Sequence, residues 1–207
     1  AFDNPVGSNL PQSDAVLIKN ATIWTSEAAG NLTESDILFS NGKIAAVGRK
    51  LSAPRNAKVI DGTGLHVTPG IIDCHSHTAV VGGVNEGTNI ITAECRIEDV
   101  LDPDDINIYR QLAGGTTAAN ILHGSANAIG GQNAVVKWRW GSGASALLIE
   151  SAPQGIKFAL GENPTRSNGS RQGRYPATRM GVERVIRSGF QRAHDYRQAQ
   201  KLAMSGN

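Results

Sequence analysis

The chain has 207 residues and a formal net charge of +2, and hydrophobic residues make up 40% of it. This length can bury a substantial core, and no apolar run approaches the roughly 18 residues that a membrane-spanning helix needs. We therefore expect a globular protein without a membrane span. Seven arginines lie between Arg166 and Arg192 beside one acidic residue, Glu183, but only two aromatic side chains accompany them, so we expect no nucleic-acid partner.

Cysteine content and the first residues bear on the cellular compartment. Cys74 and Cys95 are too few for a disulfide framework and lack zinc-ribbon spacing. The chain begins with Ala1 and Phe2, without an initiator methionine and without a basic or apolar leader. Removal of a secretory leader would place the protein outside the cytoplasm, whereas simple trimming would not. The location therefore stays unknown, with an extracytoplasmic one slightly favoured.

Residues 15–67 have the pattern of β-structure. Short apolar runs predict strands at residues 16–24, 36–40, 43–48, 58–60 and 65–67. Asn41 and Gly42 supply the positive φ values of a type I′ hairpin turn. The sequence Asp-Gly-Thr-Gly at residues 61–64 predicts a second hairpin. We expect a small N-terminal β-sandwich over residues 1–67 that has too few strands to close by itself.

From Thr68 onwards the pattern becomes that of βα units. Residues 71–74 form a short continuous apolar run, as expected of a strand with both faces buried. Further strands are predicted at residues 94–100, 116–122 and 154–160, and helices at 103–113 and 178–204. Asp102 is the predicted N-cap of the first helix, and Gly114 its end. Residues 124–143 are predicted to form a Gly-rich loop.

His75 and His77 follow the apolar strand directly. Because side chains alternate along a strand, residues two apart project from the same side, so the two imidazoles can converge on one cation. Zinc accepts neutral imidazole nitrogen, and a catalytic zinc keeps one position for water, whose pKa it lowers towards about 7. A His-x-His sequence also arises by chance, and such histidines can simply form hydrogen bonds in a loop.

The sequence Thr-Pro-Gly-Ile-Ile-Asp-Cys-His-Ser-His at residues 68–77, after a β-sandwich, resembles the start of the barrel in the amidohydrolase superfamily. Residues 114–117, 122–127 and 129–133 are similar to its imidazolonepropionase-like branch. The resemblance implies an α/β fold in which the β-sandwich precedes the first half of a metal-dependent (β/α)8 TIM-type barrel. This half would occupy residues 68–207, with strands 1 to 4 and the following helix.

The same resemblance implies one or two divalent metals, with zinc expected, and makes His75 and His77 the first two ligands. Many members also use a fourth-strand lysine, carboxylated by carbon dioxide, to bridge two metals, and Lys157 matches it. Carboxylation needs a neutral amine, which burial among apolar neighbours favours. Lys157 follows His75 by 82 residues, against about 94 expected between these barrel strands. The alternatives are an ordinary strand-end lysine and, as a weaker rival, Lys137.

His123 ends the strand predicted at residues 116–122, where barrel enzymes place site residues. We expect it to be catalytic, contacting substrate or steadying an oxyanion, although it could instead cap a helix or loop. Gln132 and Asn133 are further candidates for substrate binding, in a stretch that could equally be only a loop. Arginines between residues 166 and 179 could receive a carboxylate or form a solvated face, and no role is assigned to them.

These features predict a metal-dependent hydrolase that cleaves an amide or cyclic amide C–N bond with a metal-activated hydroxide. The substrate would be a small molecule or short peptide, such as an acyl-amino acid or an imidazolone-type ring. The superfamily's other ligands come from the fifth, sixth and eighth strands, so we expect this chain alone to be incomplete and inactive and to need the C-terminal half of the barrel. We also expect a homo-oligomer.

Two alternatives come from other functional classes. One is a non-catalytic structural or binding subunit that needs a complementary chain. The other is a phosphate-binding module on residues 124–143, which is set aside because the Gly-Lys-Ser/Thr ending of a P-loop is absent there. The sequence does not decide the substrate, the number of metals, or whether Lys157 is carboxylated.

Overall fold

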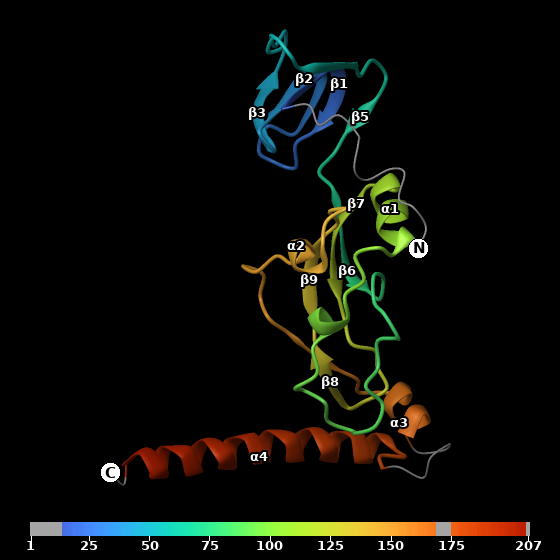
Figure 1. Cartoon of the computed structure of the whole chain (residues 1–207), viewed down its shortest axis with the longest axis vertical. Coiled ribbons are helices and arrows are strands. Elements are labelled where there is room, and N and C mark those ends of the chain that lie inside the picture. Colours follow the sequence, from blue (N-terminus) through green and yellow to red (C-terminus); the bar gives the residue numbers. More distant parts are fainter. Residues whose placement is uncertain (1–13, 169–174, 206–207) are drawn as a thin grey trace. The chain divides into compact units, whose positions relative to one another are not determined.

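The structure, a computed structural model, describes residues 14–168 and 175–205, with backbone only for 166–168. The chain divides into two units, Ala1–Gly70 and Ile71–Asn207 (Figure 1). Both strands and helices are present, which confirms a mixed α/β chain. Within the described ranges, each helix is too short or too polar to cross a membrane.

The first unit is a five-stranded sheet. Its strands are β1 (Ala15–Trp24), β2 (Asn31–Ser40), β3 (Lys43–Gly48), β4 (Lys58–Asp61) and β5 (His66–Val67). The order is β3-β2-β1-β4, and β5 also pairs with β1. Asn41 (φ 51°) and Gly42 (φ 72°) join the antiparallel strands β2 and β3, which confirms the predicted turn. Ala21, Ile23 and Ile37 form the core of this unit.

The second hairpin predicted for this unit is wrong. β4 and β5 each run parallel to β1, beside successive parts of it, and do not form a hairpin with one another. At Gly62 a Cβ would lie 2.8 Å from both the Ala21 side chain and the Lys19 carbonyl, so the chain can follow β1 this closely only with glycine. The five strands form one sheet, and the sandwich stays a prediction.

The described residues of the second unit form ten elements, of which α4 is the longest. They are β6 (Ile71–Ser76), η1 (Ile97–Val100), α1 (Ile106–Ala113), β7 (Thr116–Ile121), β8 (Ile129–Gln132), β9 (Ala134–Lys137), α2 (Ala144–Leu147), β10 (Ile156–Phe158), α3 (Glu162–Asn168) and α4 (Arg179–Ser205). β6 pairs in parallel with β7, and β7 pairs antiparallel with β9. β8 and β10 form a separate antiparallel pair.

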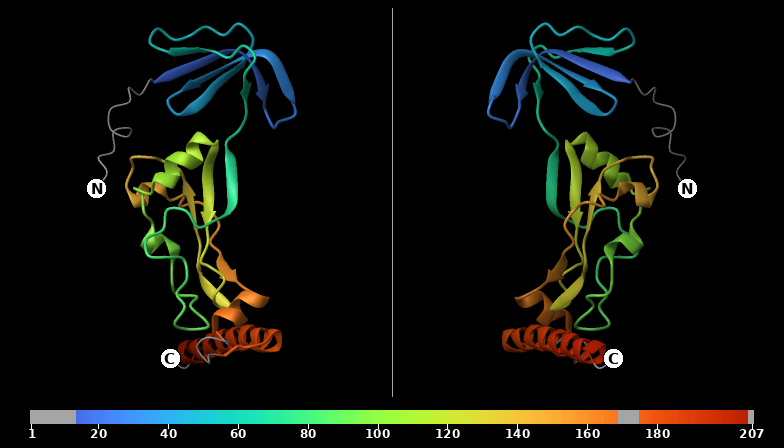
Figure 2. Two further views of the ribbon diagram at one scale, coloured as in Figure 1. Left: turned by 90° about the vertical axis from the view of Figure 1, so that its right-hand side faces the viewer. Right: turned by 90° about the vertical axis from the view of Figure 1, so that its left-hand side faces the viewer.

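A buried apolar cluster and a close contact of α4 stabilise the second unit. Ile108 of α1, Ile121 of β7, Val136 of β9 and Leu147 of α2 belong to one buried cluster. α4 runs across the end of the unit beside β8 and β10 (Figure 2), where a Cβ at Gly189 would lie 2.9 Å from the Ile129 side chain. The helix therefore lies close to β8 at a residue with no side chain.

The strand predicted at residues 94–100 is wrong. Ile97–Val100 forms the 3-10 helix η1, and Arg96 makes only an isolated bridge with Gln132. The Arg96 guanidinium contacts Glu98 at 2.6 Å and Asp99 at 2.7 Å, and these short-range ion pairs accompany the turn. As a result β7, predicted as a third strand, is the direct parallel neighbour of β6.

The Gly-rich loop predicted at residues 124–143 is also wrong, because β8 and β9 lie within it. Gly130 and Gly131 belong to β8, and a Cβ on them would lie 2.7 Å from His123 Nδ1 and 2.6 Å from the Cys95 carbonyl, respectively. The glycines thus allow close approach of neighbouring segments within a strand. The strand predicted at residues 154–160 is present but shorter, as β10.

The helices largely follow the prediction. α4 matches the helix expected at residues 178–204 to within one residue at each end. α1 ends at Gly114 as expected, but its N-cap is Asp105, whose side chain accepts the Asn107 N–H, and not Asp102.

Among the described residues, β6 is not buried on both faces as its apolar sequence predicts. Ile71 and Ile72 are 58% and 69% exposed. β6 is the edge strand of its sheet, with β7 as its neighbour, so the described residues leave its other edge uncovered.

Candidate metal site

His75 and His77 lie at the carboxyl end of β6. Their rings are 5.2 Å apart between centroids, with an interplanar angle of 90°. Both are exposed, whereas Ser76 between them is buried, so the alternation of the strand places the two imidazoles on one side. The local geometry predicted from the sequence is present.

Backbone groups hold the two histidines in place. Nδ1 of His77 lies 2.9 Å from the Leu122 carbonyl oxygen, and the Leu122 N–H donates to the Ser76 carbonyl at 3.1 Å. A carbonyl can only accept, so Nδ1 of His77 carries the hydrogen and Nε2 keeps its lone pair. The His75 N–H donates to Asp73 Oδ1 at 3.1 Å. Of these contacts, the one between the His77 ring and the Leu122 carbonyl is of the kind that orients a metal-binding imidazole.

Lys157 on β10 reaches His75, with 3.4 Å between Nζ and Nε2. The positive charge of Lys157, followed by burial and by His77, lowers the pKa of His75, and Asp73 opposes this shift. The neutral imidazole, the form that binds metal, is therefore favoured. Lys137, the rival candidate, is exposed at the end of β9, where it pairs with Ala118.

His75 and His77 provide two of the donors that a divalent cation needs. Two neutral imidazoles are suitable zinc ligands, and a third donor usually completes the protein's share of a catalytic site. Lys157 could be that donor only without its proton, because an ammonium has no lone pair. Its neighbours Ile156, Phe158 and Leu160 are exposed, so the apolar burial expected around it is wrong. Within residues 14–168 and 175–205, no three His, Cys, Asp or Glu side chains gather as a metal site.

His123 lies in a different environment, because it is only 3% exposed. Its Nδ1 is 2.8 Å from the Gly124 carbonyl, and its Nε2 accepts the Glu86 N–H at 2.8 Å. Both nitrogens of a neutral ring are thus bonded to backbone. These bonds organise a loop, and the catalytic role of His123 stays a prediction.

Gln132 and Asn133 also connect segments of the second unit. Gln132 Nε2 donates to the Ala93 carbonyl at 2.9 Å. Asn133 Nδ2 donates to Asn120 Oδ1 at 2.5 Å, and its own Oδ1 is buried with no hydrogen-bond partner among the described residues. The role of Gln132 and Asn133 in substrate binding stays a prediction.

Relatives were found by both sequence and structure, although no family model matches the chain. The chain is 36% identical over 86% of its length to amidohydrolase tasK of Hapsidospora irregularis, covering 21% of that protein. It superposes on an amidohydrolase from Thermotoga maritima with a TM-score of 0.80 and 37% identity, over 92% of this chain and 50% of that one. The chain belongs to the amidohydrolase superfamily. It spans about a fifth of tasK and half of the Thermotoga protein.

Shorter stretches match other enzymes of this kind. Imidazolonepropionase of Idiomarina loihiensis is 39% identical over 31% of the chain and 16% of that protein. D-hydantoinase of Geobacillus stearothermophilus is 51% identical over 30% of the chain and 12% of that protein. The predicted resemblance to the imidazolonepropionase-like branch is thereby supported, alongside other branches of the amidohydrolases.

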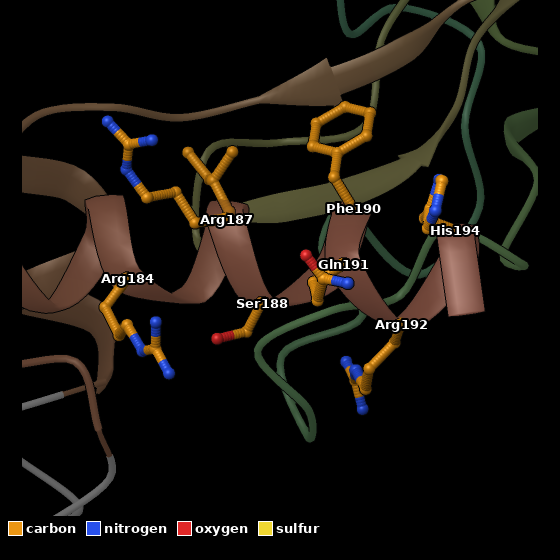
Figure 3. A pocket seen from close by; sticks show the side chains of 8 residues that line it. Arg184, Arg187, Ser188, Phe190, Gln191, Arg192 and His194 are labelled. Atoms are coloured by element: carbon orange, nitrogen blue, oxygen red, sulfur yellow. The ribbon is translucent and has the colours of Figure 1, made fainter. Parts of the chain in front are cut away.

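A hollow of about 760 Å³ lies away from the histidine pair, along α4 (Figure 3). It is lined by side chains of that one helix, including Arg184, Arg187 and Phe190, so it is a surface groove. Phe190 stacks on Phe158 of β10, with ring centroids 6.0 Å apart. Of the arginines considered for carboxylate binding, Arg171 and Arg174 lie outside the described residues, as does the side chain of Arg166.

Sequence reasoning on this amidohydrolase chain missed the contacts between residues 84–92 and 122–127. Asn127 is fully buried and donates from Nδ2 to the Glu86 carbonyl and to Thr92 Oγ1, both at 2.6 Å. These partners lie 41 and 35 residues earlier in the chain, so no local pattern could have revealed them.

Proposed function

We propose that this chain is part of a metal-dependent hydrolase in which His75 and His77 hold a divalent cation, with zinc as the best match to their chemistry. The observation that carries the proposal is the convergence of two exposed imidazoles at the carboxyl end of β6, in a chain of the amidohydrolase superfamily. Barrel enzymes place their sites at the carboxyl ends of parallel strands.

We propose further that residues 68–207 form the first half of a (β/α)8 barrel. The parallel strands β6 and β7, connected through α1, support this arrangement. So do the exposed apolar side chains of β6 and β10, because the strands of a closed barrel are covered on both faces. The remaining strands would then supply the other ligands and the rest of the pocket.

Each residue of the site has a distinct task in this proposal. When bound, the metal supplies Lewis-acid chemistry that polarises a carbonyl and makes hydroxide available at neutral pH. His77 is oriented by its bond to the Leu122 carbonyl, so that Nε2 is available as a ligand. Lys157 keeps His75 neutral while it is charged. Carboxylation of Lys157 by carbon dioxide would release the ammonium protons and replace the positive charge with an anionic carbamate that has two oxygen donors.

The proposed substrate is an amide or a cyclic amide. The names of two relatives, imidazolonepropionase and D-hydantoinase, favour an imidazolone- or hydantoin-type ring. An acyl-amino acid or short peptide carries the same C–N bond and is the second candidate.

The test uses the whole protein, loaded with zinc and assayed for hydrolysis of hydantoin and of N-acetyl-amino acids. His77→Ala should abolish turnover and zinc retention after dialysis, because it removes one of two imidazole donors. His194→Ala, an exposed histidine of α4, is the matched control and should change neither. If His77→Ala retained the zinc content of the wild-type protein, the assignment of the metal site to His75 and His77 would be wrong. A protein that held no zinc and hydrolysed nothing would favour the non-catalytic subunit.

A further inference from the structure

The His77 ring is oriented by the Leu122 carbonyl oxygen, which lies 2.9 Å from Nδ1. This carbonyl belongs to the peptide unit that joins Leu122 to His123. A peptide unit is planar, so the positions of these two residues together set the direction of the oxygen. Leu122 is held by β6, because its N–H donates to the Ser76 carbonyl at 3.1 Å. The contacts that hold His123 therefore also decide where the His77 ring points.

Hydrogen bonds hold the His123 side chain at both of its ring nitrogens. The residue is only 3% exposed, Nδ1 donates to the Gly124 carbonyl at 2.8 Å, and Nε2 accepts the Glu86 N–H at 2.8 Å. A Cβ at Gly124 would overlap the Asn85 side chain, so residues 84–86 pack directly against this stretch. Turning the buried ring would leave polar groups without partners, and that is costly.

Two glycines of β8 leave the space that the His123 ring occupies. A Cβ at Gly130 would lie 2.7 Å from His123 Nδ1 and 3.3 Å from the Lys157 carbonyl oxygen. A Cβ at Gly131 would lie 3.0 Å from the ring carbon Cδ2. Glycine within a strand marks such a close approach. The ring is therefore packed against β8, next to β10, the strand that carries Lys157.

We infer that His123 is a positioning residue, which fixes the Leu122 carbonyl and thereby keeps the hydrogen of His77 on Nδ1 and its Nε2 lone pair available. Because backbone groups occupy both nitrogens of His123, this role differs from the catalytic role predicted from the sequence. Outer hydrogen-bond partners of a metal-bound imidazole typically contribute about 10–100-fold to metal affinity. The inference rests on the proposed function, since His77 is a proposed ligand.

The test follows the His77 ring in the whole protein without metal. Nitrogen NMR of isotope-labelled histidine reports which ring nitrogen carries the hydrogen, and in the wild-type protein this should be Nδ1 of His77. His123→Leu removes the acceptor for the Glu86 N–H at similar size, so His77 should become a mixture of tautomers. His123→Gln, whose Oε1 can accept that N–H, should restore the wild-type signal. Ile108→Ala, at a fully buried residue of α1, is the matched control and should destabilise the fold without changing His77.

Zinc affinity, measured against a competing chelator, extends the test to the metal site. His123→Leu should bind zinc about 10–100-fold more weakly than the wild-type protein, and Ile108→Ala should bind it equally well. An unchanged His77 signal in His123→Leu would overturn the inference, whatever the zinc affinity. If His123→Leu does not fold, Gly130→Ala decides by the same signal, because its Cβ would displace the ring. A changed His77 signal in a protein that binds no zinc would support the positioning role and refute the proposed metal site.

Discussion

His75 and His123 are both histidines of the second unit, and their environments differ completely. His75 is exposed, next to the His77 ring and the Lys157 amine. His123 is buried, and backbone groups occupy both of its ring nitrogens. The comparison teaches that a histidine at a strand end is a candidate ligand only where the fold leaves it a lone pair. Residue type and position alone do not decide this.

The same contrast between a covered and an uncovered side chain exists for isoleucine in adjacent strands. Ile121 of β7 is fully buried, whereas Ile72 of β6 is largely exposed. Ile121→Ala should lower the free energy of unfolding by about 2–5 kcal/mol, because it leaves a cavity. In this chain without the proposed remaining strands, Ile72→Ala should lower the free energy of unfolding by under about 0.5 kcal/mol. Urea unfolding followed by tryptophan fluorescence measures both. Equal losses would mean that β6 is covered in solution.

Replacing the two histidines should separate stability from metal binding. His123→Ala should lower the free energy of unfolding by about 2–3 kcal/mol, because the Glu86 N–H loses its partner and a cavity forms. His75→Ala should change it by under about 0.5 kcal/mol but remove zinc binding. Urea unfolding and zinc analysis of both variants give the comparison. A larger loss of unfolding free energy in His75→Ala than in His123→Ala would contradict this expectation.

Asp36 extends the comparison to a carboxylate of the first unit. It is buried and accepts the Asn20 and Leu51 N–H groups, both at 2.8 Å, and the first of these bonds contributes most to lowering its pKa. A lowered pKa in the folded state stabilises the fold above the ordinary value, and this stability is lost as the pH falls through the folded value.

Asp36→Asn should therefore lower the free energy of unfolding by about 1–2 kcal/mol at neutral pH. It should also make the free energy of unfolding fall less steeply as the pH is lowered. Thermal unfolding between pH 7 and pH 2 measures this change. Asp61→Asn, at an exposed carboxylate, is the control and should have the smaller effect. An identical acid dependence in wild type and Asp36→Asn would contradict the assignment.

The smallest expected effect concerns the start of α1. Asp105 caps this helix, and its second oxygen accepts the Ala79 N–H at 2.8 Å. Asp105→Ala should lower the free energy of unfolding, measured with urea, by about 1 kcal/mol. Asp104→Ala, an exposed neighbour, should cost almost nothing. Similar losses in both would show that the cap is not formed by Asp105.

Local patterns predicted those features that neighbouring residues determine. The turn at Asn41 and Gly42 follows from their tolerance of positive φ, and α4 follows from its helical periodicity. The proximity of His75 and His77 follows from strand alternation. In each case the interactions that decide the structure lie within a few residues of one another.

Features that depend on distant partners were not predictable in this way. The pairing of both β4 and β5 with β1 depends on contacts across some 40 residues. Likewise, nothing near His123 in the sequence indicates that Glu86 occupies its ring nitrogen. The approach of Lys157 to His75 was expected only from the family resemblance, because 82 residues separate them. The exposure of β6 could not be read from its own apolar sequence, because that sequence does not specify what covers the strand.

In the proposed site, His75 and His77 hold one divalent cation. Crystals of the whole protein grown with zinc, with diffraction recorded on both sides of the zinc absorption edge, test it most directly. We expect an anomalous peak about 2.0–2.1 Å from a ring nitrogen of each histidine. Fully occupied zinc at His66 or His194, with no peak between His75 and His77, would contradict it.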